Sequence, residues 1–188
     1  MQGEGVQKND KEAVRWYRFA AEQGFPQAQH RLGMLFQNGQ GARQNYKEAA
    51  RWYRLTAEQG HVIAQLNLGA IFEHGQGVQK NDKEAARWFR LAAEQGEASA
   101  QFILGAMFEQ GQGVQKNDEE AARWYRLAAE QGFASAQFDL GLVFEHGRGV
   151  QKNDNEAARW YRLAAEQGHA KAQLNLGVMF EHGRGVQK

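Results

Sequence analysis

Residues 77–112, GVQKNDKEAARWFRLAAEQGEASAQFILGAMFEQGQ, form one complete copy of a unit that recurs along the whole chain. Tryptophan sets the period, because all five tryptophans stand 36 residues apart, at Trp16, Trp52, Trp88, Trp124 and Trp160. A Gly-Val-Gln-Lys-Asn loop returns with the same spacing and has one divergent copy, at 41–45. Residues 5–184 therefore hold five copies (5–40, 41–76, 77–112, 113–148 and 149–184), which we assign to a single repeat domain over residues 1–188.

The first half of each copy predicts a helix that begins after an asparagine. Asn81 and Glu84 have the spacing of a capping box, in which the Asn side chain accepts from a helical amide and the Glu reaches back to the cap amide. In the first copy an apolar stripe at helical spacing is formed by Ala13, Trp16, Tyr17, Ala20 and Ala21. Gly24 and its equivalents are expected to end this helix in the left-handed conformation.

The second half of each copy predicts another helix, over 27–38 in the first copy. Its buried stripe is Ala28, Leu32, Leu35 and Phe36. Every copy also places a glycine inside this helix (Gly33, Gly69, Gly105, Gly141 and Gly177), where glycine costs about 1 kcal/mol relative to alanine. Because this cost is repeated in every copy, we predict that another backbone approaches the helix closely at this glycine. Because two such short helices cannot bury their stripes alone, we expect an all-α solenoid of about ten helices in which each copy contacts its neighbours.

These residues resemble the Sel-one-like repeat (SLR) family, a relative of the tetratricopeptide repeat. The resemblance is carried by the pattern Ala28, Leu32, Gly33, Phe36, Gly39 and Gly41, followed by Asn45, Ala49, Trp52, Tyr53, Ala57 and Gly60. It recurs in register in all five copies and covers essentially the whole chain. The resemblance implies a right-handed superhelix whose concave surface binds a partner protein or peptide. It also implies that the helix bearing Leu-Gly, at 27–38 and its four equivalents, lines that surface.

The copies differ from one another mainly in this second helix, although copies 77–112 and 113–148 differ at only eight of 36 positions. Its variable positions form one face away from the buried stripe, and we predict that this face binds the partner. The predicted partner-binding residues are Gln27, His30, Arg31, Met34, Ile63, Leu66, Asn67, Ala70, Ser99, Phe102, Ile103, Ala106, Ser135, Phe138, Asp139, Leu142, Lys171, Leu174, Asn175 and Val178. Ile103 is the strongest single indication, because its equivalents are polar or charged. The alternative is that an unconstrained surface drifts freely.

The sequence offers little for catalysis or cofactors. There is no cysteine, and the only serines, Ser99 and Ser135, open equivalent helices, where serine commonly helps to cap. His74, His146 and His182 are separated by whole repeats, on the order of 10 Å apart, whereas zinc needs ligands about 2 Å from one centre. The Gly-x-Gly-Val loop lacks the Gly-Lys-Ser/Thr ending of a phosphate loop. We therefore predict no enzyme activity, no metal and no cofactor.

Charge argues against a nucleic-acid or membrane partner. A net charge of +1 gives no general attraction to either, and no apolar run is long enough to cross a bilayer. Arg15 and Arg18 flank aromatic residues, as in some single-strand binders, but Glu12 and Glu22 stand at ion-pair spacing from them, as their equivalents do in every copy. No secretory signal follows Met1, and the compartment stays open.

The sequence therefore predicts a non-catalytic scaffold or adaptor for protein partners. The near-identity of two copies leaves open a different class, an idealised or engineered repeat array without a natural ligand. The chain also starts on a Trp-bearing helix and stops at Lys188, just before the next capping Asn. The first Trp-bearing helix has no Leu-Gly helix before it, and the last Leu-Gly helix has no Trp-bearing helix after it. These complementary ends predict head-to-tail self-association, which is a heterologous contact.

Overall fold

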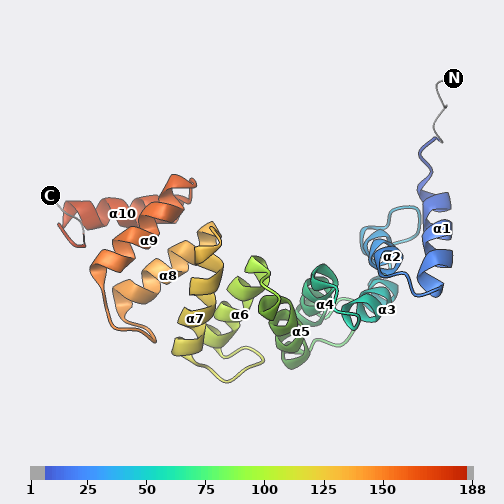
Figure 1. Ribbon diagram of the computed structural model, residues 1–188, viewed down its shortest axis with the longest axis horizontal. Coiled ribbons are helices and arrows are strands. Elements are labelled where there is room, and N and C mark those ends of the chain that lie inside the picture. The colour runs from blue at the N-terminus through green and yellow to red at the C-terminus, as the bar shows by residue number, and fades with distance from the viewer. Residues whose placement is uncertain (1–6, 186–188) are drawn as a thin grey trace. The chain divides into compact units, whose positions relative to one another are not determined.

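The computed structural model describes residues 7–185, which fold into ten α-helices and no strand (Figure 1). Gly5 and Val6 of the first predicted copy lie outside the described residues, and so does Lys188. The chain divides into two compact units, Met1–Asn81 and Asp82–Lys188. The first unit holds α1 (Asp10–Glu22), α2 (Pro26–Asn38), α3 (Tyr46–Ala57) and α4 (Val62–His74). The second holds α5 (Asp82–Glu94), α6 (Ala98–Gln110), α7 (Asp118–Glu130), α8 (Ala134–His146), α9 (Asp154–Glu166) and α10 (Ala170–Glu181).

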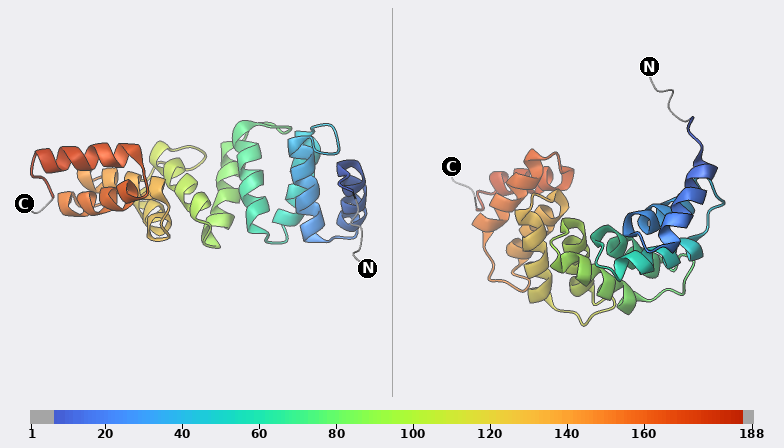
Figure 2. Two further views of the ribbon diagram at one scale, coloured as in Figure 1. Left: turned by 90° about the horizontal axis from the view of Figure 1, so that it is seen from above. Right: turned by 45° about the vertical axis from the view of Figure 1, so that its right-hand side comes forward.

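Each copy supplies an odd-numbered helix that carries the tryptophan, the Trp helix, and an even-numbered helix that carries Leu-Gly, the Leu-Gly helix. Within each unit every helix packs mainly on the helices before and after it in the chain. Figure 2 shows this order in the second unit, where the helices coloured from green to red follow one another side by side. The predicted all-α repeat solenoid is thus confirmed. None of the described helices combines the length and apolar character needed to cross a membrane.

The Trp helices begin at the predicted asparagines, but only half of the capping box forms. The side chain of Asn45 accepts from the amide of Glu48 at 3.1 Å. The backbone amide of Asn45 donates instead to the carbonyl of Phe36, at 2.9 Å, and Glu48 pairs with Arg51 at 3.7 Å. The prediction that this glutamate reaches back to the cap amide is therefore wrong, because closure of the preceding loop already uses that amide.

The glycine inside α2, α6 and α8 accommodates an aromatic ring rather than a backbone, whereas nothing lies within 4 Å of a Cβ at Gly177 in α10. A Cβ atom at Gly33 would lie 2.7 Å from Cδ1 and Cε1 of Tyr53 in the next Trp helix. Gly105 lies against Tyr125 in the same way. The predicted close approach of a backbone occurs instead at the loop glycine Gly41, where a Cβ would overlap the Asp10 carbonyl group. Gly41 also has a φ of +69°, so the loop requires glycine on two counts.

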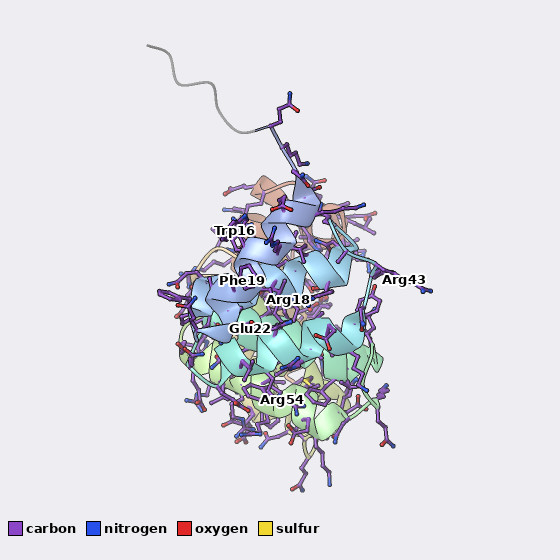
Figure 3. All side chains as sticks on the ribbon, turned by 90° about the vertical axis from the view of Figure 1, so that its right-hand side faces the viewer. Trp16, Arg18, Phe19, Glu22, Arg43 and Arg54 are labelled. Atoms are coloured by element: carbon purple, nitrogen blue, oxygen red, sulfur yellow. The ribbon has the colours of Figure 1, made fainter. Side chains whose placement is uncertain are left out.

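The predicted buried stripe of the Trp helix holds in four copies and is wrong in the first. Trp124 is 6% exposed, whereas Trp16, which Figure 3 shows at the surface, is 63% exposed. In α1 only Val14 and Ala21 are buried, because no helix of residues 7–185 covers the face that carries Trp16 and Tyr17. The predicted stripe of the Leu-Gly helix is buried throughout α4, α6 and α8. In α2 Leu35 is half-buried, and in α10 the stripe is partly uncovered, with Phe180 51% exposed.

Candidate protein-binding face

All twenty predicted binding residues lie on the Leu-Gly helices, and none of them is buried. The exposed members are Gln27, Arg31, Ile63, Lys171 and Leu174, and the other fifteen are half-buried. Ile103 belongs to the half-buried group rather than standing fully in solvent. Each predicted residue therefore keeps part of its surface in solvent.

Two pairs of stacked rings include predicted residues. His30 stacks on His61 with ring centroids 4.6 Å apart, and Phe138 stacks on His169 at 4.7 Å. The second ring of each pair lies just before the next Leu-Gly helix, and the sequence reasoning did not select it. Positions 25, 61, 97, 133 and 169 vary between copies, and this is the signal that nominated the other positions and that could have found these rings.

One cavity of about 340 Å³ brings predicted residues together in the second unit. Its walls are Ser135, Phe138, Asp139, His169, Ala170 and Lys171. Four of these six were predicted, and His169 and Ala170 were missed. The predicted residues of α6, such as Phe102, do not line this cavity. An aromatic wall thus lies beside one acidic and one basic side chain, an arrangement that suits a peptide with an apolar side chain and a neighbouring charge.

A row of polar contacts fixes the tyrosines behind the face. The Tyr125 hydroxyl donates to Glu109 Oε2 at 2.8 Å, and Arg148 donates to the other oxygen of that carboxylate. One repeat later Tyr161 donates to Glu145 at 2.6 Å. Burial raises the pKa of the Tyr125 hydroxyl far above its usual value, so it remains a protonated donor. These bonds hold each ring on its glycine and join successive copies.

The position of Ile103 has a structural explanation. Three of its equivalents act on the pKa of a tyrosine hydroxyl, which Asn67 lowers at Tyr53, Asn175 lowers at Tyr161 and Asp139 raises at Tyr125. The copy that contains Ile103 has Phe89 where the others have tyrosine. An apolar residue therefore occurs in the copy that lacks the hydroxyl. This pairing weakens the argument that Ile103 by itself marks a contact surface.

Asp139 should make stability depend on pH. Burial, followed by the nearby Glu109 carboxylate, raises the pKa of Asp139 to about 6, against the opposing effect of Arg148 and Lys171. Since the pKa of an unfolded aspartate is about 3.9, the folded chain binds this proton more tightly, and its contribution to stability is lost as pH rises through about 4–6. We expect Asp139→Asn to raise the urea midpoint at pH 7 and to lose that gain at pH 4. The exposed Glu130→Gln is the control, and an equal gain for Asp139→Asn at both pH values would contradict the assignment.

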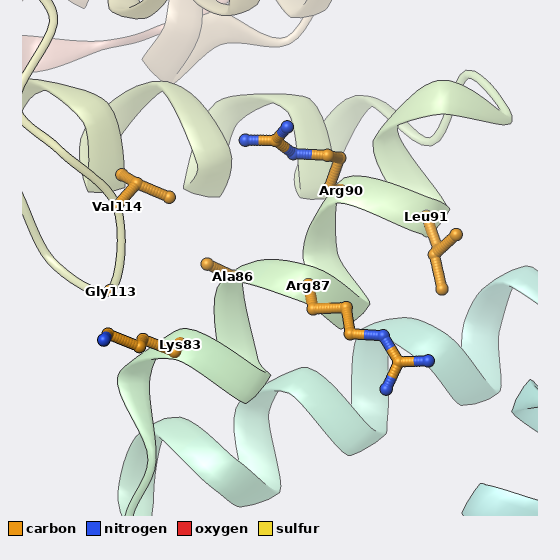
Figure 4. Close-up of a pocket in the computed structure, with 7 residues that line it drawn as sticks. All are labelled: Lys83, Ala86, Arg87, Arg90, Leu91, Gly113 and Val114. Atoms are coloured by element: carbon orange, nitrogen blue, oxygen red, sulfur yellow. The ribbon is translucent and has the colours of Figure 1, made fainter.

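A second groove lies over α5 and the loop that follows α6, and Figure 4 shows it. Its lining is Lys83, Ala86, Arg87, Arg90, Leu91, Gly113 and Val114. The guanidinium groups of Arg87 and Arg90 point away from one another in this view. Arg87 pairs with Glu84 at 3.5 Å and lies over the Trp88 ring, and Arg90 lies over the Phe108 ring at 5.6 Å. The arginines of this face are thus engaged in packing the repeat.

The first copy shows where the predicted ion pairs hold. Arg15 pairs with Glu12 at 3.6 Å, as predicted. Arg18 lies over the Phe36 ring at 5.8 Å, and no ion pair of residues 7–185 joins it to Glu22, so that prediction is wrong. In the other four copies the Trp rings are buried, which leaves them no face for stacking on a nucleotide base.

Ser99 and His146 make contacts within their own helix and its flank. The prediction that Ser99 helps to cap α6 is wrong, because Glu97 caps this helix. The Glu97 side chain accepts from the Ser99 amide and, at 2.8 Å, from the Ser99 hydroxyl. Nδ1 of His146 lies 2.9 Å from the Leu142 carbonyl oxygen, near the end of α8. In the described part of the chain, no group of three or more His, Asp or Glu side chains is arranged to hold a metal.

The sequence matches the Sel1 repeat family over residues 1–25, 26–61, 62–97, 98–133, 134–169 and 170–188. These units begin at the Leu-Gly helix, so they divide the same 36-residue period at a different point from the copies used above. A search of the curated proteins finds no match.

Three solved structures illustrate what the fold is similar to. A protective antigen of uropathogenic Escherichia coli strains, described as displaying an SLR fold, is 41% identical with a TM-score of 0.94 over 99% of this chain. This chain spans only 40% of that protein. A Sel1 repeat protein from Oxalobacter formigenes is 36% identical with a TM-score of 0.82, covering 96% of this chain and 77% of that one. Cysteine rich protein B of Helicobacter pylori is 25% identical with a TM-score of 0.53, covering 71% and 96%.

Proposed function

Because the chain belongs to the Sel1 repeat family, whose members generally mediate protein–protein interactions, we propose that it is a non-catalytic scaffold that binds a peptide segment of a partner protein along its Leu-Gly helices. The observation that carries the proposal is the cavity between α8 and α10, where Phe138, Asp139 and Lys171 meet. This face also collects most of the variation between copies, while the Trp helices stay nearly constant. A specific binding surface requires side chains that differ between copies on helices held by a constant framework.

The chemistry of the cavity indicates the kind of segment that fits. The stacked Phe138 and His169 rings offer an apolar wall. Asp139 and Lys171, on the same cavity, supply one acceptor group and one donor group. An extended or helical segment with an apolar or aromatic side chain and an adjacent charged one would satisfy all of them. Two explanations compete with binding. The sequence of an unused surface could drift freely, or the array could have no ligand.

A random peptide library displayed on phage, panned against the whole chain, tests the proposal. We expect enriched peptides with an apolar or aromatic residue beside a charge, and we expect Phe138→Ser to weaken their binding at least tenfold, about 1.4 kcal/mol. Lys171→Glu should reverse the preferred charge of the peptide. Leu55→Ser, which removes a leucine exposed on α3, is the matched control and should bind like the original chain.

Two results would overturn the proposal. One is panning that enriches no sequence, which would favour an array without a ligand. The other is a set of enriched peptides that bind the Phe138→Ser and Lys171→Glu chains as tightly as the unchanged chain. Circular dichroism of each variant shows that its helices are intact before binding is compared.

A further inference from the structure

The cavity between α8 and α10 holds three polar side chains that the fold leaves unused. Within residues 7–185, no hydrogen bond or ion pair is made by the Ser135 hydroxyl, the Asp139 carboxyl group or the Lys171 ammonium group. The equivalent serine of α6 donates to Glu97 at 2.8 Å, but Phe133 stands at that position before α8. All three groups therefore remain available to a ligand.

The surroundings of Asp139 favour its protonated form. Its side chain is half-buried on α8, and the Glu109 carboxylate of α6 also opposes its ionisation. The Arg148 guanidinium acts in the other direction, but it is already bonded to Glu109. Burial, together with the neighbouring carboxylate, raises the pKa of Asp139 to about 6. Asp139 therefore gains a proton at mildly acidic pH, within the range in which the chain is folded around it.

The other titratable groups around Asp139 include one that also gains a proton near neutral pH. The hydroxyls of Tyr125 on α7 and Tyr161 on α9 stay protonated, because burial raises their pKa values. Lys171, at the start of α10, supplies a positive charge to the cavity. The imidazole of His169 lines the same cavity, and histidine is the side chain that most often changes charge in this range. Asp139 therefore has to be distinguished from His169 by experiment.

A proton changes what Asp139 offers to a ligand. The ionised carboxylate only accepts hydrogen bonds, whereas the neutral carboxyl group has an O–H donor. With Asp139 neutral, the cavity presents donors from Ser135, Asp139 and Lys171, and the ammonium gives it a positive charge. A carboxylate complements this set, since hydrogen bonds to an ionised acceptor are about twice as strong as those between neutral groups. With Asp139 ionised, the same ligand meets a like charge.

We propose that the cavity binds the side-chain carboxylate of an acidic residue in the partner segment, and that Asp139 must be protonated for this binding to be tight. The acidic residue belongs to the peptide segment of the proposed function, on which this assignment rests. Its carboxylate accepts from the three donors described above, and an adjacent apolar side chain packs on the stacked rings of Phe138 and His169. Binding is therefore coupled to proton uptake, and it weakens as pH rises through the titration of Asp139.

Panning the peptide library against the whole chain at pH 5.5 and at pH 7.5 tests the proposal. We expect peptides enriched at pH 5.5 to combine an aspartate or glutamate with an apolar residue, because their carboxylates are still ionised at that pH. In titration calorimetry, a synthetic copy with an amidated C-terminus should show a Kd that rises about tenfold to thirtyfold between the two pH values, since only a few per cent of Asp139 is neutral at pH 7.5. Replacing the acidic residue of the peptide by its amide should remove most of this pH dependence.

Two variants assign the proton to its group. Asp139→Asn should bind the acidic peptide about equally at both pH values, because the amide is a donor throughout and asparagine stands at the equivalent position of α4 and α10. His169→Phe is the matched control, since it keeps a ring beside Phe138 and cannot be protonated. Phenylalanine already precedes α8 at this position of the repeat. His169→Phe should therefore retain the pH dependence of the unchanged chain.

Loss of the pH dependence in His169→Phe, or its persistence in Asp139→Asn, would overturn the proposal. Enriched peptides that bind Phe138→Ser weakly but carry no acidic residue would also overturn it, while leaving the proposed scaffold function in place. Panning that enriches no sequence at either pH would overturn both.

Discussion

Replacing Trp124 by alanine should lower the free energy of unfolding by about 3–5 kcal/mol. The Trp124 side chain is 6% exposed and lies in the interior of the second unit, so truncation removes buried apolar surface and leaves a cavity. Trp16 occupies the equivalent position of the first copy but is 63% exposed. Trp16→Ala should therefore change the free energy of unfolding by no more than about 0.5 kcal/mol.

Urea unfolding followed by circular dichroism measures both variants at a concentration where the unchanged chain is monomeric. Repeat arrays lose cooperativity as they lengthen, so midpoints and slopes are compared together. The sequence alone gives the two tryptophans the same role. Equal losses of stability for Trp124→Ala and Trp16→Ala would contradict the difference in burial and, with it, the uncovered face of α1.

Gly141→Ala should lower the free energy of unfolding by about 1–3 kcal/mol, the usual range for overpacking a well-packed core. The new Cβ would lie 2.5 Å from Cδ1 and Cε1 of Tyr161, and that ring is held by its bond to Glu145. Alanine is favoured over glycine in a helix by about 1 kcal/mol, but this gain is smaller than the cost of displacing a hydrogen-bonded ring. The net effect is a loss of stability.

Gly177→Ala is the matched control, and its effect should have the opposite sign. The helical position in the repeat is the same, but nothing lies within 4 Å of the added Cβ. Only the helix preference remains, and α10 should gain up to about 1 kcal/mol. Urea midpoints of the two variants decide the matter. If Gly141→Ala stabilised the chain as well, the tyrosine ring could not be the reason for glycine in this helix.

The period and the helix ends could be predicted from sequence because their causes are local. Asn45 caps a helix whose third amide is three residues away, and Gly24 ends a helix with a φ of +88°. Such interactions are determined by the spacing of residues within one helix and its flanks. The same holds for the ion pair between Arg15 and Glu12, which the repeat places one helical turn apart.

The wrong predictions concern partners on a neighbouring helix. The ring on Gly33 comes from Tyr53, twenty residues later in the chain, and the Arg18 guanidinium meets Phe36 of the next helix instead of Glu22 of its own. Spacing within a helix says which side chains share a face. It does not say which atoms of the adjoining helix fill the space above that face, since this depends on how the two helices pack.

For the candidate site, too, the residues on one helix could be predicted and the contacts between helices could not. Phe138 and Asp139 could be selected from variation between copies, but His169, which stacks on Phe138 from the start of the next helix, could not be paired with it. The cavity exists because residues about thirty positions apart meet across the α8–α10 face. Ile103 was selected because it varies between copies, but its identity follows from its own copy. Phe89 of that copy lacks the hydroxyl that tyrosine supplies in the others.

The proposed function requires that a partner peptide bind the Leu-Gly helices and not the Trp helices. Amide chemical-shift mapping with a peptide selected by display tests it most directly on the whole 21.2 kDa chain. We expect the largest shifts at residues around the cavity, including Ser135, Asp139 and Lys171. Shifts confined to the groove over α5, around Arg87 and Arg90, with none at the cavity, would contradict binding by the Leu-Gly helices.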